Sequence, residues 1–257
     1  MRSVKQNLSK SFLRFFPILF LLIFFVMPIL LWIFLNQNLF SIHSLIHPPF
    51  FKQFWVTGLI ALITAFSSVV LSYPVALLWW VNKKTKWSVT IVFLVFVPII
   101  LGLLTRNYAW ISILSYTPFQ YSFEAVILVM LYIFIPFAFF ILIQGFGNIS
   151  NSTIEAAKTM GANIFESFRK VIFPQTLRHI NIALFFVFAN SLCYYITPAM
   201  IGGGKYDMIG NIIWKYVDKG LFADASNISL TFIFYVLSIF TVVLLFFFMR
   251  RKKYLSR

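Results

Sequence analysis

A polar stretch broken by a glycine decides the fold of this chain: Glu155-Ala156-Ala157-Lys158-Thr159-Met160-Gly161, followed after nine residues by Val171-Ile172-Phe173-Pro174. Very hydrophobic blocks of sequence flank it on both sides. An ordinary solvated loop between two hydrophobic helices is the alternative interpretation, but such a loop needs no fixed spacing of glutamate, glycine and proline. The stretch is therefore predicted to be a structured element with a role of its own.

Local signals predict two short helices within this stretch. Ser152 and Glu155 have the spacing of a capping box, which favours a helix that begins near Thr153. Gly161 is expected to end or bend that helix. Residues 163–172 then offer a second short helical run before the proline.

The composition is that of a polytopic membrane protein. Of the 257 residues, 61% are hydrophobic and only 11% are charged, and the mean hydropathy is +0.92. Globular domains carry about 25% charged residues. A net charge of +15 could indicate nucleic-acid binding, but the basic residues form short clusters beside apolar runs, which is the pattern of membrane topology. The prediction is an all-α membrane protein.

Six runs are long enough to cross a bilayer, which requires about 20 mostly apolar residues. They are Phe16–Leu35, Trp55–Val81, Ser88–Leu114, Ala125–Ile143, Ile180–Met200 and Ser229–Met249. The first run lacks a small-residue cleavage site and is expected to be a retained helix. The predicted organisation is a cytoplasmic N-terminal arm at 1–15, a transmembrane domain at 16–249 with a loop at 148–176, and a basic tail at 250–257.

Lysines and arginines are unevenly distributed between the two sides of these predicted spans. With the N-terminus inside, only five of the 21 basic residues lie on the outer side: Lys52, Arg106, Lys205, Lys215 and Lys219. An excess of Lys and Arg marks cytoplasmic loops. Both termini and the Glu155 stretch are therefore predicted to be cytoplasmic.

The stretch resembles the cytoplasmic Glu-Ala-Ala loop of bacterial ABC-importer permeases. In that family its end reads Ile-x-Leu-Pro, and here Val171 and Phe173 replace the Ile and the Leu. The resemblance covers about 54–249 and implies a type I permease core with a cytoplasmic coupling helix in the inner membrane. It implies that the following residues contact an ATPase subunit: Glu155, Ala156, Ala157, Gly161 and Pro174.

The same resemblance implies the partners of the chain. An importer of this kind would pair the chain with a second permease, either a copy or a homologue, above two ATPases and below a periplasmic solute-binding protein. A short helix at 207–217 would suit contact with that binding protein. ATP hydrolysis is expected on the separate ATPase, so the chain itself is predicted to be no enzyme and to need no cofactor.

Two further motifs resemble the spermidine/putrescine branch of these permeases. One is Arg106-Asn107-Tyr108-Ala109-Trp110, at the end of the third predicted span, and the other is Thr197-Pro198 followed by Gly202-Gly203. A polyamine is the favoured solute. Phosphonate, ferric iron, sulfate and thiamine are the alternatives within the same class.

Candidate pathway residues lie in the third and fifth predicted spans, the aromatic ones near the outer ends. They are Arg106, Tyr108, Trp110, Asn190, Tyr194, Tyr195 and Thr197. Aromatic faces can stabilise a desolvated ammonium, and Asn190 in mid-membrane is expected to need a partner, either another helix or a solute. Arg106 is either a functional charge or an anchor that reaches the outer headgroups.

The sequence lacks the residues that two other classes of membrane protein, ion-coupled carriers and membrane-bound enzymes, would need. An ion-coupled secondary carrier usually needs acids within the membrane, and the acids here fall at helix starts or in loops. A membrane-bound enzyme is less favoured still, because no paired carboxylates, HExxH or Cys-x-x-Cys set is present. His43 and His47 could in principle share a metal, but the following Pro48-Pro49 favours a plain loop, so no metal site is predicted.

Overall fold

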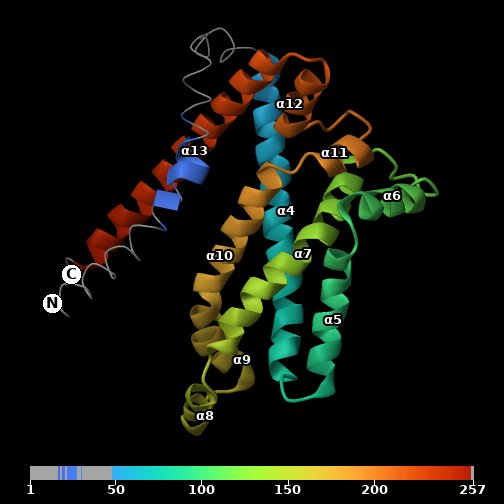
Figure 1. Cartoon of the computed structure of the whole chain (residues 1–257). Helices are drawn as coiled ribbons and strands as arrows, with labels where there is room; N and C mark the ends of the chain where they lie inside the picture. Colours follow the sequence, from blue (N-terminus) through green and yellow to red (C-terminus); the bar gives the residue numbers. More distant parts are fainter. Residues whose placement is uncertain (1–16, 18, 21, 28–29, 31–47, 256–257) are drawn as a thin grey trace, which may run out of the picture. The chain divides into compact units, whose positions relative to one another are not determined.

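Three long helices form the centre of the fold: α4 (Pro48–Val81), α7 (Phe123–Gly147) and α10 (Phe173–Leu192) (Figure 1). The computed structural model describes residues 17, 19–20, 22–27, 30 and 48–255. Every regular element among these residues is helical, which confirms the predicted all-α class. The rest of the central unit, residues 48–215, is built around these three helices.

The described residues contain three helical stretches long and apolar enough to cross a membrane: Phe51–Val81, Phe123–Gly147 and Phe165–Leu192. A bent pair, α5 (Lys86–Ile100) and α6 (Leu103–Leu114), makes a fourth if it counts as one span. Helix α13 (Phe222–Leu255) covers the sixth predicted span. Its part at Phe222–Ser238 is apolar but shorter than a full span. The first predicted span, the N-terminal arm and both histidines of the first loop lie largely outside the described residues; the π-helix η1 (Leu22–Val26) is the element described there.

Small side chains let α4 approach its neighbours closely. Ala61, Ala65, Ser68, Ser72 and Ala76 recur every three or four residues and are all buried. Membrane helices associate through such small residues because lipid offers no hydrophobic driving force between helices. The Ser72 hydroxyl also donates to the backbone carbonyl of Ile135 in α7, at 3.0 Å.

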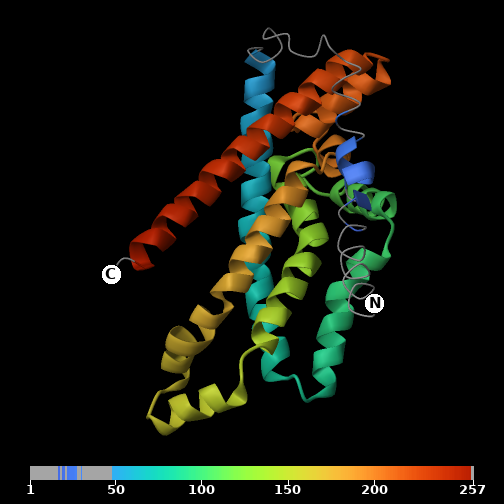
Figure 2. The same ribbon diagram turned by 60° about the vertical axis from the view of Figure 1, so that its left-hand side comes forward.

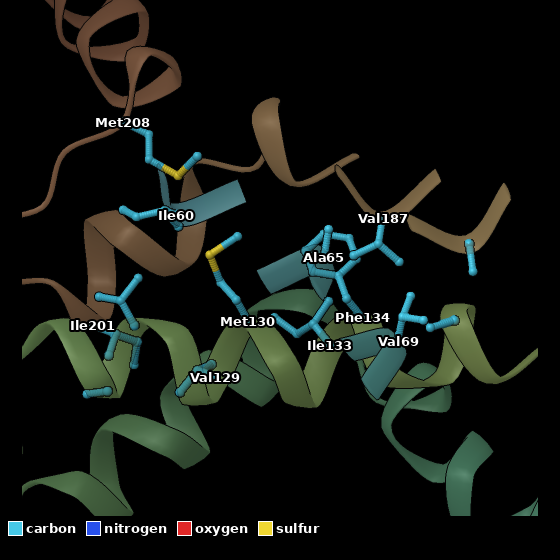
Figure 3. Close-up of a cluster of buried hydrophobic side chains, with 14 of the residues drawn as sticks. Ile60, Ala65, Val69, Val129, Met130, Ile133, Phe134, Val187, Ile201 and Met208 are labelled. Carbon is cyan, nitrogen blue, oxygen red and sulfur yellow. The ribbon is translucent and has the colours of Figure 1, made fainter. Parts of the chain in front are cut away.

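A hydrophobic cluster fills the space between these helices (Figure 3). Ile60 of α4, Met130 and Ile133 of α7 and Val187 of α10 are all buried in it. Met208, which lies just before α12 (Ile209–Asp218), joins the same cluster. The core therefore ties the three long helices to the segment at residues 201–209.

The predicted third span, Ser88–Leu114, is wrong as a continuous helix. Helices α5 and α6 meet at 96°, with Leu101 and Gly102 in extended conformation between them (Figure 1). In a continuous helix the carbonyl of Pro98 would accept the N–H of Gly102. Here the Arg106 guanidinium donates to that carbonyl instead, at 3.0 Å. Hydropathy could not reveal the bend, because both halves are apolar.

The predicted fifth span, Ile180–Met200, is wrong at both ends. Helix α10 begins at Phe173 and ends at Leu192, and a separate short helix, α11, covers Ile196–Ile201. Helical structure starts earlier because the path from α9 through η2 continues past Pro174 into α10. The second span also begins earlier than predicted, at Pro48, where a proline in the first helical turn loses no backbone hydrogen bond.

The close packing of α7 against α10 can be tested by substitutions at two glycines of α7. A Cβ on Gly145 would lie 2.7 Å from Cγ of His179 in α10, whereas a Cβ on Gly147 would meet nothing within 4 Å. Overpacking of this kind costs about 1–3 kcal/mol. We expect Gly145→Ala to lower the thermal stability of the purified protein and Gly147→Ala to leave it unchanged or raised. Equal melting temperatures for the two variants would contradict the close approach of α7 and α10.

Candidate functional site

The Glu155 stretch forms a projecting elbow of two helices, α8 (Asn151–Thr159) and α9 (Ile164–Ser167). Figures 1 and 2 both show it at the end of the central unit where α4 turns into α5. Gly161 lies between the helices with φ +83°, a conformation that glycine adopts without strain. The predicted break at Gly161 and the second short helix are both confirmed.

The predicted capping box of Ser152 and Glu155 is wrong. The cap is Ser150, whose hydroxyl oxygen accepts the N–H of Thr153 at 3.3 Å, so α8 starts at Asn151. This leaves the exposed Glu155 side chain without a capping role. The carboxylate is therefore available for contacts outside its own helix.

A capping box does occur one helix later, where the sequence analysis did not place one. The side chain of Asn163 accepts the N–H of Glu166 at 2.8 Å, and Glu166 accepts the N–H of Asn163 at 3.3 Å. Lys170 adds an ion pair to Glu166 at 3.2 Å. The Asn-x-x-Glu spacing was the signal that could have located the start of α9.

A π-helical turn, η2 (Phe168–Ile172), joins α9 to α10 without a break. Its wider turn is closed by the N–H of Phe173, which donates to the carbonyl of Phe168. Pro174 has no N–H and its ring crowds the carbonyl four residues before it, so a locally widened turn relieves the clash. The helical path from Ile164 to Leu192 is consequently continuous, and Pro174 is an exposed residue within it.

Two large apolar side chains are exposed at the tip of the elbow, whose other exposed residues are mostly polar. Met160 is 87% exposed and Phe165 is 70% exposed. Ala156 is exposed as well, and Ala157 is half-buried. The elbow thus carries two exposed large apolar side chains on a segment that is otherwise mostly polar.

A second group of predicted residues lies at the opposite end of the central unit, around α6 and α11. Thr197 and Asn107 are both fully buried, and the Thr197 hydroxyl donates to the Asn107 amide oxygen at 2.8 Å. The Tyr194 side chain lies close to both and packs edge-on against Phe134, with ring centroids 5.5 Å apart. The structure therefore brings the two polyamine-type motifs of the sequence together.

Two further polar residues complete this end of the unit, and the sequence analysis gave neither a site role. Thr57 of α4 accepts the N–H of Ile209, the first residue of α12, at 2.9 Å. Asn211 donates to the carbonyl of Tyr195 at 2.7 Å and accepts the N–H of Met208. Helix α12 itself confirms the predicted short helix at 207–217 within two residues.

The remaining candidate residues do not converge on one site. Tyr108 is exposed, Trp110 packs against Tyr132, and Tyr195 stacks on Trp214. Asn190 is exposed and donates to a carbonyl of its own helix rather than to another helix.

Metal-ligating side chains are sparse in this unit. In the part of the chain that the structure describes, no three His, Cys, Asp or Glu residues are grouped so that they could hold a metal ion.

Comparisons with known proteins identify the family of the chain. Residues 7–257 match the family described as binding-protein-dependent transport system inner membrane component. The spermidine/putrescine permease PotB of Salmonella typhimurium (strain SL1344) is 27% identical over 211 residues, which are 74% of this chain and 72% of that protein. The ferric transport permease FbpB of Actinobacillus pleuropneumoniae is 29% identical over 124 residues, which are 48% of this chain and 18% of that protein.

A solved structure gives the same fold. The MetNI methionine ABC transporter in an inward-facing conformation matches with a TM-score of 0.63 at 18% identity, over 75% of this chain and 90% of the matched chain. The match of the family to nearly the whole sequence decides the assignment: this chain belongs to the binding-protein-dependent inner-membrane permeases of ABC importers.

Proposed function

We propose that the chain forms one half of the membrane pathway of a polyamine importer and that its α8–α9 elbow receives force from an ATPase subunit. The observation that carries the coupling role is the elbow itself, with exposed Met160 and Phe165 at its tip. Methionine and aromatic side chains are enriched in protein interfaces. The methionine transporter with a similar fold is an ABC transporter, and an ATPase is the partner proposed for this surface.

The helical connection behind the elbow suits it to transmit movement. A push on α8 and α9 would pass through η2 into α10, because the helical path is unbroken up to Leu192. Helix α10 packs against α4 and α7. The Tyr73 and Thr176 hydroxyls share a hydrogen bond of 3.0 Å between α4 and α10. The pathway would then switch between inward- and outward-facing states by rocking of packed helices.

The proposed solute is a polyamine such as spermidine or putrescine. The spermidine/putrescine relative matches 74% of this chain, against 48% for the ferric relative. The Arg106 guanidinium donates to a backbone carbonyl at the end of α5 and holds α6 against α5 there. That arrangement supports passage of a cation, since the guanidinium faces a carbonyl at a helix C-terminus, where positive charge is favoured.

The proposed assembly follows from the same arrangement. A second permease would complete the pathway, and a periplasmic binding protein would deliver the solute at the α6 and α12 end. Both termini and the elbow would lie in the cytoplasm, as the distribution of basic residues indicates.

The orientation can be tested with reporter fusions in the membrane of intact cells. Fusions after Lys84 and Lys158 are expected to report the cytoplasm, and a fusion after Thr117 is expected to report the periplasm. A periplasmic signal at Lys158 would reject the coupling role together with the orientation.

The coupling role can be tested with two glycines of matched geometry. Gly161 and Gly204 both have positive φ and open space at the Cβ position, but they lie at opposite ends of the unit. A side chain at either costs roughly 1–2 kcal/mol of backbone strain. We expect Gly161→Val to lose ATPase copurification and uptake, while Gly204→Val retains ATPase copurification.

Two glutamates of the elbow provide a second comparison within the same experiment. Glu155→Ala is expected to weaken ATPase attachment without lowering stability, because Glu155 caps no helix. Glu166→Ala removes one of the two bonds of the capping box at α9 and the ion pair with Lys170, and is expected to lower stability instead. Normal uptake by the Gly161→Val and Glu155→Ala double variant would be evidence against a coupling elbow.

The solute can be tested at Arg106. Glutamine keeps a donor for the Pro98 carbonyl but removes the charge, so Arg106→Gln is expected to spare uptake of labelled spermidine. If the solute is an anion, the same variant should lose uptake of a labelled phosphonate. The assay uses cells that lack their own systems for both compounds. Absence of competition by any polyamine would reject the cation proposal.

A further inference from the structure

A cavity of about 910 Å³ lies between the α4–α5 corner and the elbow. One wall comes from the end of α4, including Leu77, Trp80 and Val81, and the facing wall comes from Ile154, Phe168 and Ile172 of the elbow and its η2 junction. Ligand sites typically enclose about 300–1,000 Å³ and are mostly apolar. The cavity thus has the size and the lining of a site for an amphiphilic molecule.

Positive charge is concentrated at one edge of this cavity. Lys83 and Lys84, followed by Thr85, line it from the turn between α4 and α5, and the opposing carboxylate is Glu155. Lys83 also lies over the ring of Trp79, 5.8 Å from its centroid. Tryptophan beside lysine is typical of the level of lipid headgroups in a membrane protein.

An unsatisfied hydroxyl lies in the wall of the same cavity. Ser167 is 5% exposed, and its hydroxyl has no hydrogen-bond partner within the described protein. Buried polar side chains in native proteins are usually paired. The Ser167 oxygen is closed off by its neighbours, so Ser167 forms part of the wall but does not present its hydroxyl to a bound molecule.

We propose that this cavity binds an anionic phospholipid, with its phosphate near Lys83 and Lys84 and the beginning of its acyl chains against the apolar walls. Basic pockets between membrane helices on the cytoplasmic side favour such headgroups. The basic N-terminal arm of the chain is the wrong occupant, because its charge has the same sign as that of the two lysines. The lipid would bridge the α4–α5 corner and the elbow, so the composition of the leaflet would affect coupling.

The proposal rests on the cytoplasmic position of the elbow but not on the identity of the solute. Binding is therefore measured directly, by native mass spectrometry of the full-length protein in detergent with added phosphatidylglycerol or phosphatidylcholine. We expect the wild type to retain phosphatidylglycerol preferentially. The Lys83→Gln and Lys84→Gln double variant should bind it on the order of tenfold more weakly, since each lysine near a charged surface contributes several-fold.

Two controls distinguish a cavity from diffuse surface charge. Lys86→Gln removes a neighbouring exposed lysine that does not line the cavity and should leave retention unchanged. Ala162→Leu adds volume to the lining without changing charge and should reduce retention.

The proposal would be overturned by equal retention in the double variant, or by equal losses in Lys86→Gln. Displacement of the lipid by glycerol 3-phosphate alone would also overturn it, because a soluble phosphate site needs no acyl chain. Normal lipid retention together with a failure of ATPase attachment at the elbow would instead reject the coupling role and leave the lipid site standing.

Discussion

Every backbone polar group freed where a membrane helix breaks must find a new partner, and this constraint explains much of the structure. No water is available within a bilayer to bond an exposed carbonyl or N–H. The break after α5 leaves the Pro98 carbonyl without its helical donor, and Arg106 supplies one. Where α12 begins, Thr57 accepts the first N–H of the helix. Of these two side chains, the sequence motifs single out Arg106, whereas the role of Thr57 is visible only in the structure.

The two ends of the central unit are consequently built in different ways. Around α6 and α11, buried hydrogen bonds such as Thr197 to Asn107 fix the short helices against the core. At the elbow, the bonds lie within single turns, and the apolar side chains of Met160 and Phe165 face outward. One end is held by its own interior, whereas the other exposes apolar side chains to its surroundings. Helix α10 runs between the two ends, and the proposed coupling role rests on this connection.

Sequence reasoning succeeded where a local signal fixes the conformation. Gly161 ends α8 as predicted. The long apolar runs located α4 and α7, although α4 begins seven residues before the predicted start. It failed where two signals compete over a few residues. Ser150 and Ser152 both offer a cap, and the hydroxyl that reaches the Thr153 N–H decides the start of α8. The bend at Gly102 could not be predicted from hydropathy, because the helices on both sides of it are apolar. Arg106 marks the bend, but the carbonyl to which it donates is identified only by the structure.

The bonding at the α6 end shows which polar side chains the framework itself occupies. Asn107 and Asn211 each use the amide oxygen and the amide nitrogen in bonds to the protein itself. These bonds use the oxygen and one N–H of each amide to hold the framework together. The exposed side chains of Tyr108 and Asn190 stand apart from this framework, and the Asn190 amide donates within its own helix. The polar residues at this end therefore serve mainly to hold the short helices α11 and α12 against the core.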